Sequence, residues 1–502
     1  MLIPEARRAV AVMVLASGAT IGCSRPLRPA ADLVITHANI WTGNPEQPAA
    51  MAVAVIGDRI VDVGGADEIE QWRGAATTVL DAEGRRLIPG FNDAWVRFAE
   101  GGAQLDDVDL KDAGTPAEFA RRITERAKAK PGEWILGGRW DERRWTPAAL
   151  PARALIDDIT NSSPVFVVRV DGRMALANAA ALGRAGITEQ TPDPPGGAIV
   201  RDARGFPTGV LQGAAMDAVI RVIPERTIEQ RMHAVKRAIE HAESLGITSV
   251  QDIGATYEDI SVYADLANRG ELTVRVYAVP AEGGWYDQAK LGIHRAFGSP
   301  WLRIGAVHAG VDRSLDAGAM RTRLMAADHA GLQLSVGATG DAPASQVLDL
   351  LDEIARANGG RDRRVRLGGS RLSPADLDRL ASMNVIALLQ PQLAPMPAGA
   401  LIEKGIRVSL GSGWPAASLN PMLTVQAATV KPFTVTHALS AHTSGSAFAE
   451  FQDGEKGTIA RGKLADMVIL SDDILTIPSA QIKDVRVLTT VVGGRVVHQR
   501  KP

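Results

Sequence analysis

Residues Leu87 to Phe98 read LIPGFNDAWVRF, and the rest of the chain is interpreted outward from them. Leu87 and Ile88 begin an apolar strand, Pro89 and Gly90 interrupt it, and polar residues then occupy alternate positions. A strand presents side chains in this alternating way at the mouth of a barrel. The stretch therefore predicts a strand that carries active-site positions.

Helical and strand-like segments alternate through the middle of the chain. Helices are expected at 229–245, 260–268, 320–329 and 374–383, each followed by a short apolar strand, at 247–251, 273–279, 332–338 and 385–390. This order is typical of a parallel sheet with crossover helices, and the number of units favours a closed (β/α)8 barrel. Slightly more than eight strands are expected, so the pattern does not identify which eight of them form the barrel.

The stretch from Leu87 to Phe98 resembles the first barrel strand of the amidohydrolase superfamily, in particular the family 3 (N-substituted formamide deformylase-like) branch. The motif of that branch reads P-G-F-x-D-x-H-x-H. Its two histidines bind a catalytic zinc, and the matching positions here hold Trp95 and Arg97. The resemblance covers nearly the whole mature chain. It implies an α/β fold, a (β/α)8 TIM-type barrel with a discontinuous β-sandwich domain formed from both termini.

The domain bounds follow from this resemblance together with local turn signals. We expect the β-sandwich at 31–86 plus 455–502, and the barrel at 87–454 with an insertion at about 103–215. Gly57-Asp58 lies between two apolar runs and predicts a hairpin. Gly457 to Lys463 has the spacing of a phosphate loop. Leu464 replaces the required Ser or Thr, however, and a strand is expected to follow, so a phosphate site is rejected.

The N-terminal residues 1–22 form a secretory signal peptide pattern. Arg7 and Arg8 precede an apolar run that is too short to span a bilayer permanently. Cys23, the only cysteine, follows a small residue and resembles a bacterial lipoprotein cleavage site, with residues 23–30 as a linker. This predicts lipidation and a periplasmic, membrane-anchored lipoprotein. The alternative is a secreted protein with an incidental cysteine, and neither form has an internal disulfide.

The other positions that match metal ligands of the family also carry different residues. Asp-Gly-His becomes Asp171-Gly172-Arg173, and a position held by lysine or an acid becomes Gln212. In the family motif V-H-A-x-G-D, the histidine position is Gly337 here, and the final aspartate is retained as Asp341. Residues 365–371, where the family has a further histidine, contain none. In the family motif G-S-D, the aspartate position is Gly413 here. Because a catalytic zinc needs neutral histidines and a carboxylate, the sequence predicts no metal, no cofactor and no catalytic residues of the family type.

The replacing residues suggest a different use for the barrel mouth. Arg97 and Arg173 beside Trp95 could receive a carboxylate or phosphate of a small anionic molecule, because arginine binds such groups with two parallel bonds. The predicted pocket residues are Trp95, Arg97, Arg173, Gln212, Asp252, Gly337, Asp341 and Gly413. The alternative is internal pairing of the two arginines with Asp93, Asp171, Asp252 or Asp341.

Other chemistries find little support in the sequence. There is no G-x-S-x-G elbow and no S-x-x-K, and aspartates after strands also serve as ordinary caps. His437 and His442 lack metal-pair spacing, while His233 and His241 fit a solvated helix face. The formal net charge of -2 gives no basic surface for nucleic acid.

Three functions therefore remain open at this stage. The first is a non-hydrolytic, small-molecule-binding pseudoenzyme with an amidohydrolase fold. The second is an active hydrolase of the C–N bonds of amides or N-acyl compounds. The third is a membrane-anchored structural or interaction protein. The sequence does not predict the oligomeric state.

Overall fold

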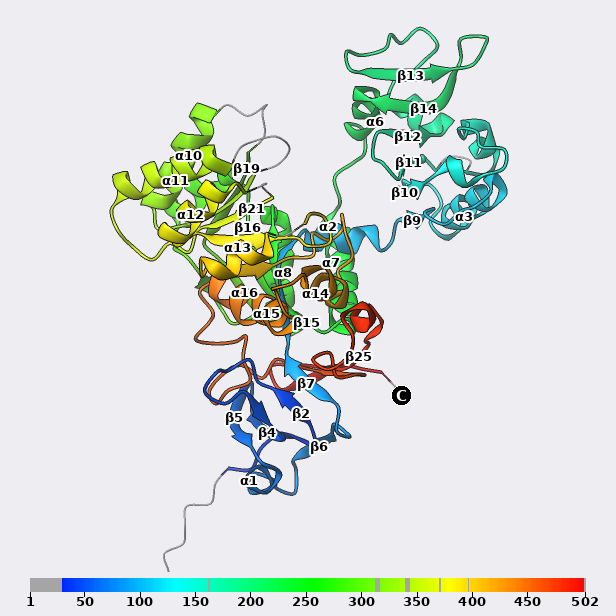
Figure 1. The fold of residues 1–502 in the computed structure, drawn as a ribbon. Helices are drawn as coiled ribbons and strands as arrows, with labels where there is room; N and C mark the ends of the chain where they lie inside the picture. The colour runs from blue at the N-terminus through cyan, green and yellow to red at the C-terminus, as the bar shows by residue number, and fades with distance from the viewer. Residues whose placement is uncertain are drawn as a thin grey trace, which may run out of the picture.

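The computed structural model describes residues 29–160, 163–311, 317–338, 344–369, 372–395 and 397–500. The predicted signal peptide, Cys23 and Asp341 lie outside these ranges. Figure 1 shows a central body of strands and helices, a β-rich end that joins both termini, and a separate lobe around β9 to β14. Within the described ranges, every helix is too short or too polar to cross a bilayer.

The β-rich end consists of two sheets that share one apolar core. One sheet has the order β5-β4-β1-β6, and the other has the order β26-β25-β24-β7-β2-β3. Because β24 pairs antiparallel with β7, the two ends of the chain meet in one sheet. The strands are β1 Leu33–Thr36, β2 Asn39–Trp41, β3 Ala49–Ala50, β4 Ala52–Ile56, β5 Arg59–Gly64, β6 Thr78–Asp81, β7 Arg86–Pro89, β24 Met467–Leu470, β25 Val487–Val492 and β26 Arg495–Gln499.

Local signals at this end of the molecule are confirmed. Gly57 has a φ of +59°, which a hairpin turn between β4 and β5 requires. The segment with phosphate-loop spacing runs into strand β24 and not into a helix, as expected. A short helix, α1 Ala66–Glu70, packs on the sheet that contains β4 and β5, and it buries Ile69.

The insertion forms its own six-stranded sheet, in the order β13-β14-β12-β11-β10-β9. Its apolar core includes the buried rings of Phe119, Trp140 and Trp145. Its strands are β9 Val108–Asp109, β10 Gly137–Trp140, β11 Phe166–Arg169, β12 Met174–Ala177, β13 Gly197–Arg201 and β14 Pro207–Gly213. Its helices are α3 Pro116–Ala129, α4 Asp157–Thr160, α5 Ala179–Arg184 and α6 Asp217–Ile220, with 3-10 turns at Glu142–Arg144, Arg153–Leu155 and Ala214–Met216.

Two largely parallel sheets form the centre of the molecule. In the first, β8, β15, β16 and β18 run parallel and β17 is an antiparallel edge. In the second, β19 to β23 are parallel in chain order. The strands are β8 Phe91–Val96, β15 Ile247–Ile253, β16 Arg275–Val279, β17 Phe297–Gly298, β18 Leu302–Ile304, β19 Ala306–Val311, β20 Gln333–Ala338, β21 Arg366–Gly368, β22 Ile386–Leu389 and β23 Val408–Leu410.

Helices connect these strands, and all four predicted helix–strand pairs are confirmed. Capping boxes at Thr227, Thr256 and Ser373 fix where three of the helices begin. The helices are α2 Phe98–Gln104, α7 Ile228–Ser244, α8 Tyr257–Asn268, α9 Trp285–Lys290, α10 Ala317–His329, α11 Ala344–Asn358, α12 Pro374–Ser382, α13 Ala398–Glu403, α14 Pro421–Ala428, α15 Val435–Ala441 and α16 Ser444–Ala449, with 3-10 turns at Glu282–Gly284 and Ser479–Asp484.

Side chains from the two central sheets meet in a shared interior. The Tyr277 hydroxyl on β16 donates to Oε1 of Gln333 on β20, over 3.0 Å. Arg366 on β21 donates to Gln251 on β15. Because these bonds join strands of different sheets, the two sheets face each other across a polar interior.

Trp95, near the end of β8, covers part of this interior. Its ring meets that of His308 edge-on, with centroids 4.9 Å apart and planes at 87°. The ring lies so close to β20 and β21 that a Cβ built on Gly337 would approach it to 2.9 Å, and one built on Gly368 to 3.2 Å. The indole therefore occupies space that exists because positions 337 and 368 carry no side chain.

We predict that Gly337→Ala destabilises the protein by about 1–3 kcal/mol, because the added methyl group overpacks against the indole. Urea unfolding measures the free energy. The matched control is Gly310→Ala, on the paired position of β19, where a Cβ meets nothing within 4 Å. In a Trp95→Ala background the cost of Gly337→Ala should shrink. An equal cost in both backgrounds would contradict the contact.

Candidate functional site

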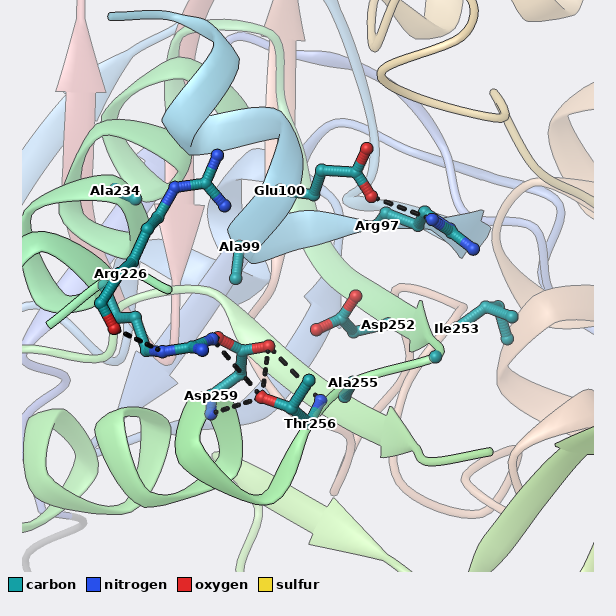
Figure 2. A pocket seen from close by; sticks show the side chains of 12 residues that line it. Arg97, Ala99, Glu100, Arg226, Ala234, Asp252, Ile253, Ala255, Thr256 and Asp259 are labelled. Atoms are coloured by element: carbon teal, nitrogen blue, oxygen red, sulfur yellow. Dashed lines mark hydrogen bonds and ion pairs between the residues drawn. The ribbon is translucent and has the colours of Figure 1, made fainter. Parts of the chain in front are cut away.

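A cavity of about 360 Å³ opens beside the carboxyl ends of β8 and β15. Arg97 enters it from the start of α2, and Asp252 enters it from β15. Figure 2 shows Arg97 and Arg226 on opposite sides of this view, with Asp252 between them. The lining residues are Arg97, Ala99, Glu100, Arg226, Arg231, Ala234, Asp252, Ile253, Gly254, Ala255, Thr256 and Asp259.

Two of the three arginines in this cavity have carboxylate partners. Arg97 pairs with Glu100 at 2.9 Å, and Arg231 pairs with Asp259 at 2.9 Å. Asp259 also closes the capping box of α8 with Thr256. Within the described part of the chain, exposed Arg226 forms no ion pair.

The third carboxylate, Asp252, is held by neutral donors. It accepts hydrogen bonds from the Phe98 amide at 2.7 Å and from the Tyr263 hydroxyl at 2.6 Å. Burial raises the pKa of Asp252 to about 7, although these bonds and the charge of Arg97 act in the opposite direction. A substantial fraction of Asp252 is therefore neutral near pH 7, and the cavity has an excess of positive charge.

Asp93, on β8, is a second buried carboxyl. It accepts bonds from the Ser412 amide at 3.0 and 3.1 Å and from the Trp95 amide at 3.1 Å. Burial raises the pKa of Asp93 to about 7, although these bonds lower it. This carboxyl fixes the end of β8 against the segment after β23, and it does not line the cavity.

The predicted site residues are divided among three places. Arg97 and Asp252 line the cavity, although Asp252 lies within β15 and not just past its strand. Trp95, Gly337 and Gly413 lie together in the interior, where the Gly413 amide donates to the Trp95 carbonyl oxygen at 3.0 Å. Three of the predicted pocket residues thus lie around the end of β8.

Arg173 and Gln212 lie in the insertion lobe. Arg173 is exposed and directly precedes β12, whose Met174 is the register partner of Gln212 on β14. Figure 1 shows this lobe apart from the central helices. Arg97 and Arg173 therefore belong to different parts of the molecule. Neither Arg173 nor Gln212 is among the residues that line the cavity beside Arg97.

The internal ion pairs also differ from those considered from the sequence. Arg97 pairs with Glu100, three residues away, and not with Asp93 or Asp252. Asp171 pairs with Arg169 at 2.5 Å. Sequence reasoning missed Glu100, Arg226 and Arg231 as cavity residues. One local signal was available: Arg97 and Glu100 are three residues apart at the start of a helix, a spacing that predicts an ion pair.

The histidines form no common site in the structure. His233 is exposed and pairs with Asp106 at 2.7 Å, as a solvated helix face would allow. His241 differs from that expectation, because it is partly buried and its ring tilts against Trp414 at 5.8 Å. His442 is buried and bonds to the Asn92 carbonyl oxygen.

Among the residues that the structure describes, the side chains around Trp95 do not form the donor set of a zinc site. Among the described residues, no three His, Cys, Asp or Glu side chains gather closely enough to hold a metal ion. Gly337 and Gly413 supply no side-chain donor, and the indole is not a metal ligand. His308 contributes one imidazole at this point, against the edge of the ring. A zinc site of the family type needs three or four such donors.

Comparison with known proteins identifies the family. The amidohydrolase family model matches residues 78–498. The chain is 31% identical to LONG AFTER FAR-RED 3 of Arabidopsis thaliana, covering 93% of this chain and 92% of that protein. It is 25% identical to N-substituted formamide deformylase of Arthrobacter pascens, covering 93% and 98%. A solved structure of an uncharacterized metal-dependent hydrolase from Pyrococcus furiosus matches with a TM-score of 0.73 and 21% identity, covering 88% and 100%. The chain therefore belongs to amidohydrolase family 3.

Proposed function

We propose that this protein is a non-hydrolytic member of the amidohydrolase family that binds a small anionic molecule. The observation that carries the proposal is the indole of Trp95, which lies against Gly337 at the convergence of positions matched to family metal ligands. A bulky apolar ring and two glycines replace the donors there. Function depends on the site and not on the fold, so family membership alone does not assign hydrolysis.

The absence of those donors bears directly on the chemistry. In a zinc hydrolase the metal lowers the pKa of bound water and so supplies hydroxide near neutral pH. Within the described ranges Asp93 is a carboxyl beside Trp95, and its oxygens already accept hydrogen bonds from backbone amides. These residues therefore support binding better than water activation.

We also infer that the two parallel sheets form one closed barrel. The cross-interior bonds of Arg366 with Gln251 and of Tyr277 with Gln333 support this inference. So does Gly411 after β23, where a built Cβ would come within 2.7 Å of the Trp95 backbone nitrogen on β8. The mouth cavity then lies at the carboxyl ends of the barrel strands, where ligands of such barrels bind.

The ligand site in this proposal is the 360 Å³ cavity. Arg226 has a guanidinium free of ion pairs within the described residues, and Arg97 shares an exposed pair that a ligand could replace. A carboxylate or phosphate suits two forked donors. The site therefore uses Arg97 with Arg226, in place of the expected partnership of Arg97 with Arg173.

Hydrolysis of C–N bonds in amide or N-acyl compounds is the alternative function. The Arthrobacter relative, which is named a formamide deformylase, favours this alternative. A structural or interaction role at a membrane is a third possibility. Neither requires an anion in the mouth cavity.

For the N-terminus, we propose that Cys23 is lipidated and holds the mature protein at a periplasm-facing membrane. The lone cysteine at the end of a signal-like segment supports this. Cys23→Ser should move the protein from the membrane fraction to the soluble fraction on cell fractionation. An unchanged distribution would rule out lipid anchoring.

Metal content separates the pseudoenzyme from the hydrolase. Purified protein should hold far less than one equivalent of zinc by elemental analysis after dialysis against a chelator. Turnover of N-substituted formamides and N-acyl amino acids should not exceed the solvent background. Close to one equivalent of retained metal together with turnover would favour the hydrolase.

Anion binding should depend on pH through Asp252. The raised pKa of Asp252, about 7 against an ordinary 3.8, makes the folded state less stable as pH rises from about 4 through 7. Because the same ionisation adds negative charge to the cavity, affinity for acetate or benzoate, whose charge is constant in this range, should fall several-fold between pH 6 and pH 8. Asp252→Asn should remove that dependence.

Thermal shift measures this binding, because a ligand at a hundred times its dissociation constant stabilises the fold by about 2.7 kcal/mol. Arg226→Ala should remove the stabilisation. Its matched control is Arg221→Ala, an exposed arginine of the same segment that does not line the cavity. Equal responses of the two variants would overturn the assignment of the cavity.

A further inference from the structure

A set of buried polar atoms inside the two central sheets lacks hydrogen-bond partners. The Arg366 side chain is fully buried, with 0% of its surface exposed, yet its Nε and Nη2 have no partner among the described residues. The same holds for the hydroxyls of Ser335 and Ser409 and for Nδ1 of His308. Buried polar groups in folded proteins are nearly always satisfied, so a cluster of unsatisfied ones indicates something that binds there.

Strand register brings these groups together on one face. His308, Ser335 and Arg366 are direct register partners across β19, β20 and β21. Register partners in a parallel sheet point to the same face, and Arg366 points toward Gln251 across the interior. Ser409 on β23 faces the same way one row further along, opposite Leu388.

The next inward-facing row of residues, toward the carboxyl ends of the strands, separates Ser335 and Arg366 from the mouth of the barrel. Gly337 and Gly368 follow Ser335 and Arg366 by two residues on the same faces of β20 and β21. The Trp95 ring covers both glycines. Ser335 and Arg366 thus lie one layer below the indole, and Ser409 lies in the row of the two glycines. None of the three lines the mouth cavity.

The charge of Arg366 has no counter-charge of its own. Its one bond goes to the neutral amide oxygen of Gln251, and the Tyr277 ring lies 5.6 Å from its guanidinium carbon. Glu450, whose charge acts on Arg366, already pairs with Lys456 at 2.9 Å. These groups together leave one positive charge uncompensated, because arginine stays protonated at any relevant pH.

Arg275 shows how the same fold treats a buried arginine that needs no ligand. It is 2% exposed and binds both carboxylate oxygens of Asp466, at 2.7 and 2.9 Å. An unpaired buried charge costs several kcal/mol, so the contrast with Arg366 requires an explanation.

We propose that Arg366, Ser335 and Ser409 hold a small monovalent anion of the halide class inside the barrel, beneath Trp95. All three can donate hydrogen bonds. One negative charge balances the one excess positive charge. This site does not depend on the function proposed for the mouth cavity, because it uses none of the same residues.

Bromide is the probe. The full protein is dialysed into sodium gluconate and titrated with sodium bromide at constant ionic strength. Thermal shift should show a saturable stabilisation that gluconate alone does not give. Crystals grown in bromide should show an anomalous peak beside the Arg366 guanidinium. Ordered waters alone on these atoms, or no saturable response, would overturn the proposal.

Substitutions test which residues are responsible for the bromide response. Arg366→Met should abolish the bromide response. It should not lower the melting temperature in gluconate, because the substitution removes an unpaired buried charge. Ser335→Ala and Ser409→Ala should each raise the bromide midpoint several-fold, and they decide the question if Arg366→Met does not fold. Arg221→Ala, an exposed arginine outside both proposed sites, is the matched control and should keep the full response. A bromide response that survives in Arg366→Met would contradict the site.

Discussion

The indole of Trp95 fits against β20 and β21 because positions 337 and 368 are glycine. A methyl group at either position would come within 2.9 or 3.2 Å of the ring. The ring in turn abuts His308 and, through the Trp95 backbone, is held by Asp93 and Gly413. The ring on β8 and the two glycines on β20 and β21 therefore depend on one another for their packing.

The fold of the family does not depend on this packing. Strand pairing and apolar packing hold the central sheets, and neither depends on the residues at the strand ends. The interior remains polar, however, and no carboxylate in the described part of the chain pairs with the charge of Arg366. An interior with one excess positive charge favours anions over metal cations.

Much of the fold could be predicted from local patterns. The helix at 374–382 was readable because Ser373, Pro374 and Asp376 form a cap and first turn in sequence. Motif resemblance grouped Trp95, Gly337 and Gly413, and the three residues do lie near one another. The cavity could not be predicted, because Arg226 and Arg231 reach it through the packing of α7 against α2 and β15. Arg173 and Gln212 were assigned to the mouth because the sequence does not show where an insertion folds.

The central claim is that an indole, and no metal, occupies the point where the matched ligand positions meet. The most direct measurement is an anomalous difference map at the zinc absorption edge, from crystals grown with excess zinc. The account predicts continuous density for the Trp95 ring against Gly337 and no zinc peak between Trp95 and His308. A full-occupancy zinc peak there, with the ring displaced, would contradict it.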